Sequence, residues 1–522
     1  MKEDAKKILP LLLVMALVSA VCLLFSVRKS GMFIDEIYTY GLSNSHYAPY
    51  LTDVQGGSFT DTVMTRQQLL DYVSVGDDDR FDFGSVYYNQ TRDVHPPLYY
   101  WLFNMVSSLT PHSFSKWTGL ALDYVIYMLA LFLLYQLART LGAGRPTAAA
   151  CAGIYGLSGM GLSTMLMIRM YVLMTALTLL LALLVARLMQ ERKRRYYPLI
   201  GLTLFLGLMT QYYFVFYAFF LCAAYVFWAL AHREFKSLGL FCLFAFAGVG
   251  ALLLAFPACL DQLFADALVS GGSAVDNLRD FSQYPTRLIT FASEMRHGLK
   301  AALLIAFGAA VVLLIFLRRL LKAGICWRWL WIVLPAVPTF VLVALISPVL
   351  DQRYVYNLAP VFVLAAGMLL DGACRLTGDK QPWAAPILCL AVLVFALQVA
   401  HYNAPQYLYP EYREYDALVA QHAQAPCVYM TDDYFAPVTE DLLQLLAFED
   451  FFVTGDADSP ALDAYLEQAD ARECVVYIDT SVFWSSGFDP DQMLPELLAS
   501  TEYTDYAPLY ANGLSETYLL TK

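Results

Sequence analysis

The 35 residues 197–231, YPLIGLTLFLGLMTQYYFVFYAFFLCAAYVFWALA, contain no charged side chain. As one straight α-helix they would be about 52 Å long, whereas the hydrocarbon core of a bilayer is about 30 Å thick. The run is interrupted at Thr210-Gln211. The sequence therefore predicts two membrane spans, 197–210 and 212–231, that meet near Gln211.

Nine further apolar runs of similar length lie on either side of this stretch. They are 8–27, 117–138, 146–166, 170–189, 237–257, 299–317, 329–346, 355–373 and 383–401. The run 8–27 follows a basic N-terminus and could be a signal peptide, but the many later runs favour an uncleaved first span. Only 15% of the 522 residues are charged, against roughly 25% in soluble domains. This composition excludes a soluble enzyme, a nucleic-acid binder and a disordered chain, and predicts a polytopic α-helical membrane protein of about eleven spans.

The basic residues predict the orientation of these spans. The N-terminus and the short loops 139–145, 190–196, 232–236, 318–328 and 374–382, with flanking Arg187, hold 18 of the 33 Lys and Arg residues. Cytoplasmic loops of membrane proteins are enriched in Lys and Arg. We therefore expect the N-terminus to lie inside and the C-terminus outside the cytoplasm.

Charge also divides the chain into two predicted domains. Residues 1–401 carry a net charge of +7, whereas residues 402–522 carry −19. The first range is the expected transmembrane domain, and the second an acidic extracytoplasmic domain. The predicted outer loop 28–113 includes an aromatic-rich segment, 96–109, that is too short to span and favours a helix lying in the membrane surface.

The acidic tail has the pattern of a small α/β domain. Strands are expected at 427–433 and 474–479, helices at 439–448 and 461–469, and an edge strand at 516–521. Cys427 and Cys474 begin the two strands, and the sequence favours two reduced thiols over a disulfide between them.

Two adjacent carboxylates, Asp35 and Glu36, follow the first span in an apolar and aromatic setting. Partial burial raises the pKa of a carboxyl group toward the value that suits a general base. The alternative is that both are interfacial charges that face water.

A second group of polar residues is Asp93-Val-His95-Pro96-Pro97. The two prolines favour an extended His95 just before a helix, and a helix N-terminus attracts anions. We expect a phosphate-binding position here; the alternative is a turn that only seats the helix at the membrane surface.

Isolated polar residues occur at the predicted outer ends of other spans. Arg169 is the only charged residue between Arg145 and Arg187. An arginine in an apolar segment needs a partner, and its planar donors suit phosphate. Asp123 in the second span is one candidate partner, and snorkelling to lipid headgroups is the alternative. The other polar residues of this kind are Tyr171, Gln211, Tyr212, Arg353 and Tyr354.

These motifs occur in an order that resembles the GT-C class of membrane glycosyltransferases, and most closely its protein O-mannosyltransferase and lipid A aminoarabinose transferase branch. The motifs are Asp35-Glu36, His95-Pro-Pro-Leu-Tyr-Tyr100, Arg169-Met-Tyr171, Thr210-Gln-Tyr-Tyr-Phe214 and Gln352-Arg-Tyr354. The resemblance covers about residues 1–400 and includes bacterial relatives. Gln211 stands where the family often has a histidine, and the acidic domain is an addition.

The resemblance implies an inverting glycosyltransferase at the outer face of the cell membrane. A polyprenyl-phosphate-linked sugar would be the donor, and a glycan, lipid or protein the acceptor. It implies Asp35 as the catalytic base supported by Glu36, and His95, Tyr171, Gln211, Tyr212 and Tyr354 at the substrate, with Arg169 and Arg353 at the donor phosphate. Some members hold a divalent metal ion, for which Asp35, Asp93 and His95 would be the ligands here.

Two other functions fit a membrane protein of this composition. A transporter or flippase for lipid-linked sugars would show internal repeats and charges near the middle of the membrane. No repeat is evident, and most isolated charges lie near the predicted outer rim. A non-catalytic protein that binds lipid-linked sugars would not need the Asp35-Glu36 pair.

Overall fold

The computed structural model describes residues 2–57, 60–264, 269–316, 327–376, 383–432, 435–481 and 487–522. Some residues of the predicted segments lie outside this part of the chain. They are Arg318, Arg319, Lys322 and Lys380 of two predicted cytoplasmic loops, and Asp433 at the end of one predicted strand. The chain forms two compact units. Unit 1 comprises Met1–Val27, Asp93–Tyr99 and Gly119–Gln406, and unit 2 comprises Arg28–Arg92, Tyr100–Thr118 and Tyr407–Lys522.

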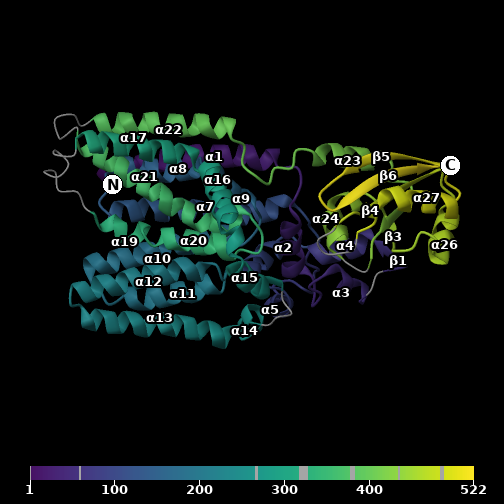
Figure 1. The fold of residues 1–522 in the computed structure, drawn as a ribbon, viewed down its shortest axis with the longest axis horizontal. Helices are drawn as coiled ribbons and strands as arrows, with labels where there is room; N and C mark the ends of the chain where they lie inside the picture. The colour runs from purple at the N-terminus through teal and green to yellow at the C-terminus, as the bar shows by residue number, and fades with distance from the viewer. Residues whose placement is uncertain are drawn as a thin grey trace. The chain divides into compact units, whose positions relative to one another are not determined.

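Unit 1 is built from helices (Figure 1). Its α-helices are α1 (Lys2–Arg28), α7 (Lys116–Thr140), α8 (Arg145–Gly156), α9 (Gly159–Leu166), α10 (Tyr171–Glu191), α11 (Tyr196–Leu208), α12 (Phe214–Ala231), α13 (Phe235–Ala255), α14 (Cys259–Phe264), α15 (Val269–Arg279), α16 (Tyr284–Gly298), α17 (Lys300–Ile315), α19 (Leu330–Val333), α20 (Ala336–Ile346), α21 (Ala359–Arg375) and α22 (Ala384–Tyr402). Three 3₁₀ segments are η1 (Phe281–Gln283), η2 (Trp327–Trp329) and η3 (Gln352–Leu358).

Most of these helices have the length and composition of membrane spans. Among the described residues, seven helices are long and apolar enough to cross a membrane, and the number rises to nine if each of two bent helix pairs is one span. The bent pairs are Arg145–Gly156 with Gly159–Leu166, and Phe281–Gly298 with Lys300–Ile315. Two shorter apolar helices, Tyr196–Leu208 and Leu330–Ile346, complete the set. The protein is therefore a mostly helical, multi-pass membrane protein, and each predicted span contains at least one of these helices.

The apolar stretch 197–231 is divided between two helices, as its length requires. α11 ends at Leu208 and α12 begins at Phe214, so the break falls at Gln211. α11 packs closely on α13, because a Cβ atom added at Gly248 would collide with the carbonyl oxygen of Gly201. Small residues at such contacts let two helix backbones approach each other within a membrane.

Unit 2 contains one six-stranded mixed sheet. Its strands are β1 (Thr62–Thr65), β2 (Cys427–Met430), β3 (Asp450–Thr454), β4 (Glu473–Asp479), β5 (Asp505–Ala511) and β6 (Ser515–Thr521). The spatial order is β1-β3-β2-β4-β6-β5; β2 runs parallel to β3 and β4, and the other pairs are antiparallel. Its helices are α2 (Ile34–Asn44), α3 (Leu51–Gln55), α4 (Arg66–Val73), α5 (Phe83–Arg92), most of α6 (Leu98–Ser107), α23 (Tyr412–Gln421), α24 (Ala436–Glu440), α25 (Leu442–Leu445), α26 (Pro460–Ala469) and α27 (Pro490–Ser500).

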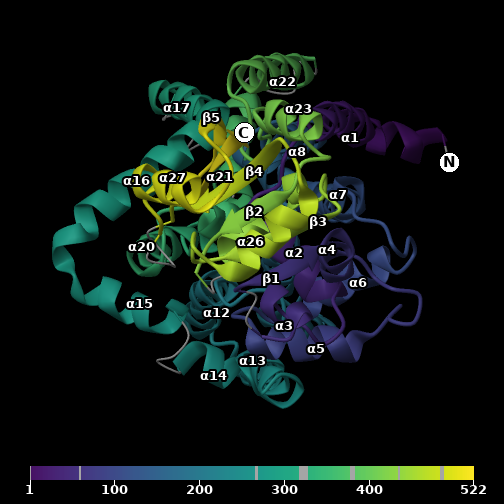
Figure 2. The same ribbon diagram turned by 90° about the vertical axis from the view of Figure 1, so that its right-hand side faces the viewer.

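Side chains along the strands point alternately to the two faces of this sheet, and both faces are buried. Val428, Met430 and Val476 point toward α26 and α27, which cover one face (Figure 2). On the other face Tyr429 and Tyr477 stack with ring centroids 5.4 Å apart. Successive side chains of a strand point to opposite faces, so strands covered on both sides read as continuous apolar runs.

β2 and β4 lie at the predicted strands 427–433 and 474–479. The expected edge strand at 516–521 is β6, but β5 lies outside it and forms the edge. Two strands have no counterpart among the predicted ones: β3, and β1, which comes from the segment 28–113 and pairs with β3. Cys427 and Cys474 are both buried free thiols.

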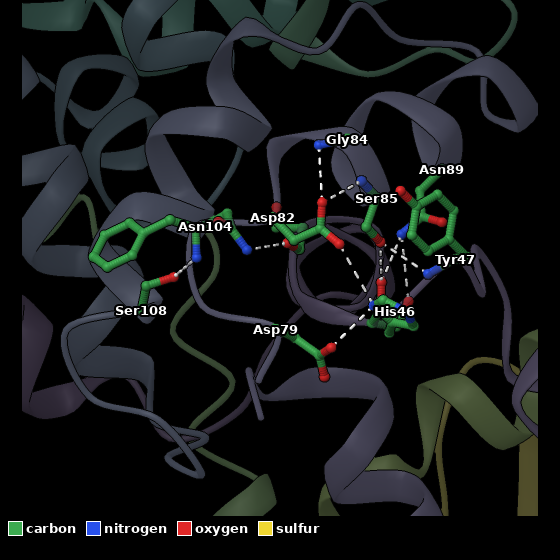
Figure 3. Close-up of polar contacts among 12 residues, drawn as sticks. His46, Tyr47, Asp79, Asp82, Gly84, Ser85, Asn89, Asn104 and Ser108 are labelled. Atoms are coloured by element: carbon green, nitrogen blue, oxygen red, sulfur yellow. Dashed lines mark hydrogen bonds and ion pairs between the residues drawn. The ribbon is translucent and has the colours of Figure 1, made fainter. Parts of the chain in front are cut away.

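Polar side chains anchor the C-terminal end of α2, the helix that carries Asp35 and Glu36. The last four carbonyl groups of a helix have no partner within the helix. Asn89 Nδ2 donates to the Leu42 and Ser45 carbonyls, at 3.3 and 2.9 Å, and Asn104 Nδ2 donates to the Ser43 carbonyl at 2.9 Å (Figure 3).

The chain segment just after α2 is held by a neighbouring cluster. His46 Nδ1 lies 3.0 Å from Asp79 Oδ1 and 3.5 Å from Asp82 Oδ2 (Figure 3). Asp82 Oδ1 in turn accepts from the backbone N–H groups of Gly84 and Ser85. The end of α2 is thus fixed by contacts that involve segments far apart in the sequence.

Candidate functional site

Unit 1 brings together three of the predicted polar residues. The His95 Nδ1 atom lies 2.8 Å from Asp93 Oδ2, and Arg169 NH2 lies 3.5 Å from the same nitrogen. A carboxylate can only accept, so the Nδ1–H of His95 donates to Asp93 and the ring presents Nε2 as its second polar atom. Asp93 and Arg169 are both buried. Burial alone would raise the pKa of the Asp93 carboxyl, but the neighbouring His95 and Arg169 hold that pKa below its ordinary value.

The sequence explains why His95 occupies this position. Pro96 and Pro97 have no N–H to donate, and α6 starts after them, at Leu98. The Leu98 N–H donates to the Met209 carbonyl at 3.0 Å. The His95-Pro-Pro segment is therefore joined to the break between α11 and α12.

A residue that the sequence did not indicate completes this connection. Gln262 is buried, and its Nε2 donates to the Asp93 carbonyl at 2.7 Å while its Oε1 accepts from the Tyr212 hydroxyl at 2.5 Å. Gln211 is also buried, and its Oε1 accepts from the Tyr212 N–H at 2.7 Å. Gln262 follows α13 in a stretch with no motif, so only the folded chain shows its role.

Asp123, the candidate partner of Arg169, is fully buried in α7. Its Oδ1 atom accepts from the Tyr99 hydroxyl at 2.7 Å. Tyr99 belongs to the same His95-Pro-Pro-Leu-Tyr motif. A buried carboxylate is costly unless it is hydrogen-bonded, and this bond meets part of that requirement.

The remaining predicted residues of unit 1 form an aromatic group. The Tyr354 ring lies edge-on to Tyr171 at 6.5 Å between centroids, and tilted against Tyr213 at 4.8 Å. Arg353 lies over the Tyr354 ring at 5.4 Å and pairs with Asp351 at 3.5 Å. Tyr171 begins α10 two residues after Arg169, so the aromatic group and the Asp93–His95–Arg169 group are adjacent along the chain.

The other predicted residues, Asp35 and Glu36, lie in unit 2 in the first turn of α2. Glu36 is completely buried, and its Oε2 atom accepts from the Lys29 ammonium at 2.8 Å and from the Phe33 N–H at 2.7 Å. Lys29 is also fully buried and donates to the Tyr407 carbonyl at 2.7 Å. Asp35 is partly exposed. The Glu36 carboxylate is thus buried in contacts that stabilise the start of the helix, and Asp35 is the more accessible carboxylate.

The acidic tail contributes another carboxyl group to this region. α24 packs against α2, and Tyr38 and Phe435 make an edge-on ring contact at 6.1 Å. Glu440, at the end of α24, accepts from the Tyr412 hydroxyl at 3.4 Å. Burial raises the pKa of Glu440 to about 8, and the nearby Asp441, Asp35 and Glu36 carboxylates act in the same direction. Neither Lys29 nor Glu440 was predicted, because no local pattern marks either of them.

The residues suggested for a metal ion do not make a three-ligand site. In the described ranges no group of three or more His, Cys, Asp or Glu side chains is arranged to hold a metal. Asp93 and His95 are instead bonded to each other. Asp35 belongs to the other unit, so unit 1 supplies only two of the three suggested ligands, and no reaction step below uses a metal ion.

Comparison with known proteins places this arrangement in context. Residues 94–260 match the family described as dolichyl-phosphate-mannose-protein mannosyltransferase. A search of curated protein sequences found no match. Among solved structures, ArnT from Cupriavidus metallidurans bound to undecaprenyl phosphate is similar, with a TM-score of 0.50, 12% identity, and 97% of each chain covered.

Two further structures share less of the geometry. The oligosaccharyltransferase AglB from Archaeoglobus fulgidus has a TM-score of 0.48 and 13% identity, with 96% of this chain and 74% of that chain covered. The arabinofuranosyltransferase AftD from Mycobacteria has a TM-score of 0.43 and 14% identity, with 97% and 40% covered. The family match and the ArnT-like fold confirm the predicted resemblance to GT-C glycosyltransferases and the predicted enzyme class, a glycosyltransferase.

Proposed function

We propose that this glycosyltransferase moves a sugar from a polyprenyl-phosphate carrier to an acceptor hydroxyl, with inversion, on the outer face of the cell membrane. The observation that carries the proposal is the Asp93–His95–Arg169 group, in which Asp93 and Arg169 are buried. His95 and Arg169 both lie in the segment that matches the mannosyltransferase family. An arginine held beside apolar helices suits a lipid phosphate, because its guanidinium offers planar paired donors to phosphate oxygens.

Asp35 is the proposed general base. The acceptor oxygen attacks the anomeric carbon on the side opposite the phosphate, and its proton passes to the Asp35 carboxylate. The bond between the anomeric carbon and the phosphate oxygen breaks, and its electron pair stays on the polyprenyl phosphate. Partial exposure of Asp35 supports this role, because a base must reach the hydroxyl that it deprotonates.

Stabilisation of the leaving phosphate is assigned to unit 1. Arg169 would donate to its oxygens, the imidazolium form of His95 would add an Nε2–H donor, and Asp93 would hold the imidazole ring in one orientation. Donors that are already fixed in place lose little reorganisation energy as charge develops. Arg353, Tyr354, Tyr171, Gln211 and Tyr212 are assigned to the surrounding substrate contacts.

The proposed membrane orientation puts residues 402–522 and the loop 28–113 outside the cytoplasm, with 1–401 as the transmembrane domain. The excess of Lys and Arg in the short loops supports this orientation. An epitope placed after Lys522 is then accessible to antibody on intact spheroplasts. Labelling that requires permeabilised cells would contradict the orientation.

The test of the activity is Asp35→Asn in the full chain, assayed in proteoliposomes with a polyprenyl-phosphate sugar and extracted acceptor. General-base catalysis typically contributes about 10²–10⁴-fold, so kcat should fall by that range. Binding of the donor lipid should persist, because Asn keeps the size of the side chain.

A matched control is Asp78→Asn, which removes an exposed carboxylate of the same unit. This variant should transfer sugar at the wild-type rate. Retained transfer by Asp35→Asn would overturn the base assignment. Absence of transfer by the wild type, together with ATP-independent flipping of the donor, would favour a transporter.

A further inference from the structure

A cavity of about 300 Å³ lies in unit 1, away from the residues discussed so far. Its lining includes Gln190, Arg192, Trp228, His232, Arg328 and Trp331. These residues come from the C-terminal ends of α10 and α12 and from the segment that begins α19. The volume is at the lower end of the range for small-ligand sites and suits a headgroup-sized occupant.

The lining carries positive charge and hydrogen-bond donors. Arg192 lies over the Trp228 ring at 6.0 Å, and its NH2 group pairs with Glu234 at 2.8 Å. A guanidinium has five N–H donors, so this pair leaves Arg192 further donors for another oxygen ligand. Arg328 is exposed and has no carboxylate partner within the described part of the chain.

The aromatic side chains give the cavity fixed walls. Trp228 and His232 are stacked at 4.6 Å between ring centroids, and His232 Nδ1 lies 2.8 Å from the Trp228 carbonyl. Trp331 forms a further wall and is exposed. Tryptophan beside arginine is the composition typical of the headgroup level of a membrane.

The position of the cavity separates it from the donor site. Arg169 and Tyr171 stand at the start of α10, whereas Gln190 and Arg192 stand at its end, and the 21 residues of α10 rise about 31 Å. That length is close to one hydrocarbon thickness. Arg192, His232 and Arg328 also belong to three of the basic loops predicted to face the cytoplasm.

We infer that this cavity binds the phosphate headgroup of an anionic phospholipid from the leaflet opposite the donor site. The cytoplasmic leaflet is the one rich in anionic lipid, and basic pockets between spanning helices on that side bind such headgroups. The site does not depend on the proposed catalytic roles, because none of its residues takes part in them.

The experiment measures lipid binding to the purified full chain in a neutral detergent by native mass spectrometry, with dioleoylphosphatidylglycerol and dioleoylphosphatidylcholine as probes. Phosphatidylglycerol should bind the wild type more tightly than phosphatidylcholine does. Arg192→Ala with Arg328→Ala should weaken phosphatidylglycerol binding about 25-fold, since each basic residue near a membrane surface contributes about five-fold. Binding of phosphatidylcholine should not change.

The matched control is Arg194→Ala, an exposed arginine of the same loop that does not line the cavity. This variant should bind phosphatidylglycerol as the wild type does. Arg192→Lys with Arg328→Lys, which keeps both charges, should retain most of the binding. Equal binding by the double Ala variant would overturn the proposal. So would displacement of phosphatidylglycerol by millimolar inorganic phosphate, or a tenfold preference for undecaprenyl phosphate.

Discussion

Asp93 and His95 are hydrogen-bonded across a single intervening residue, with Asp93 Oδ2 2.8 Å from His95 Nδ1. The bond fixes which ring nitrogen carries the proton, and Arg169 lies on the same side of the ring, 3.5 Å from Nδ1. Asp93→Asn should lower kcat/KM about 12- to 150-fold, because a hydrogen bond to a charged group contributes about 1.5–3 kcal/mol. Initial rates over a range of donor concentrations would measure this.

The control for that variant is Asp261→Asn, which changes an exposed carboxylate of α14 in the same unit. Its kcat/KM should equal that of the wild type. An Asp93→Asn enzyme with unchanged kinetics would show that the pair only seats α6.

Substitution of Arg169 should lower kcat more than substitution of Asp93 or His95. Arg169→Gln removes the cation proposed to stabilise the leaving phosphate, and the loss of one such donor costs about 10²–10³ in kcat. Arg169→Lys should recover part of the rate, since lysine keeps the charge but not the planar donors. If the Gln variant loses only affinity for the donor, with kcat preserved, Arg169 contributes to binding alone.

The Lys29–Glu36 pair predicts a large effect on stability. Lys29→Met leaves Glu36 buried without its cation, which should cost about 3–5 kcal/mol in the free energy of unfolding. Lys29→Met combined with Glu36→Gln should lose less, because no buried charge remains. Thermal unfolding of the full chain in detergent measures both.

A surface pair in the same unit serves as the comparison. Lys522 lies 2.8 Å from Glu502, whose side chain is 78% exposed. Lys522→Met should cost no more than about 1 kcal/mol. Equal destabilisation by the two variants would contradict the buried role of Lys29.

The raised pKa of Glu440 predicts how the free energy of unfolding depends on pH. Its pKa is about 8 in the folded chain, against the ordinary 4.5. Between these values the unfolded chain loses the proton while the folded chain keeps it, so stability falls as pH rises through this window. Asp441, whose pKa is raised to about 6, acts in the same direction at lower pH. The window between pH 6.5 and 8 therefore reports mainly on Glu440.

Glu440→Gln should flatten the decline in unfolding temperature between pH 6.5 and 8 and leave below pH 6 only the part of the decline that Asp441 contributes. The groups that face Glu440 are the Asp35 and Glu36 carboxylates, Asp441 and the Tyr412 hydroxyl. An unchanged slope in the variant would assign the decline to another group.

Helix packing in unit 1 supplies a steric prediction. Gly248→Ala should separate α11 from α13, because the added methyl group would collide with the Gly201 carbonyl. Overpacking of this kind typically costs about 1–3 kcal/mol. Gly250→Ala, two residues along the same helix, meets no atom within 4 Å and should leave the unfolding temperature unchanged or raised.

Much of the candidate site could be predicted because its residues occur in short motifs. His95 and Asp93 are separated by one residue, and Arg169 is conspicuous in an apolar stretch, so local chemistry was enough to select them. Gln262 could not be predicted in the same way. Its bonds to Tyr212 and Asp93 join positions 50 and 169 residues away, and nothing in its own neighbourhood marks them.

Local features were enough to predict the membrane class of the protein, the break at Gln211 and the strands β2 and β4, and to select polar residues proposed to bind a lipid phosphate. These follow from hydropathy, span length and residue chemistry, which are local properties. The folded chain was needed to show that β1 pairs with β3, that Lys29 and Glu36 form a buried ion pair at the start of α2, and that Glu440 lies close to Asp35. The physical reason is that burial and hydrogen-bond partners depend on which distant segments pack together, and local composition carries no record of that choice.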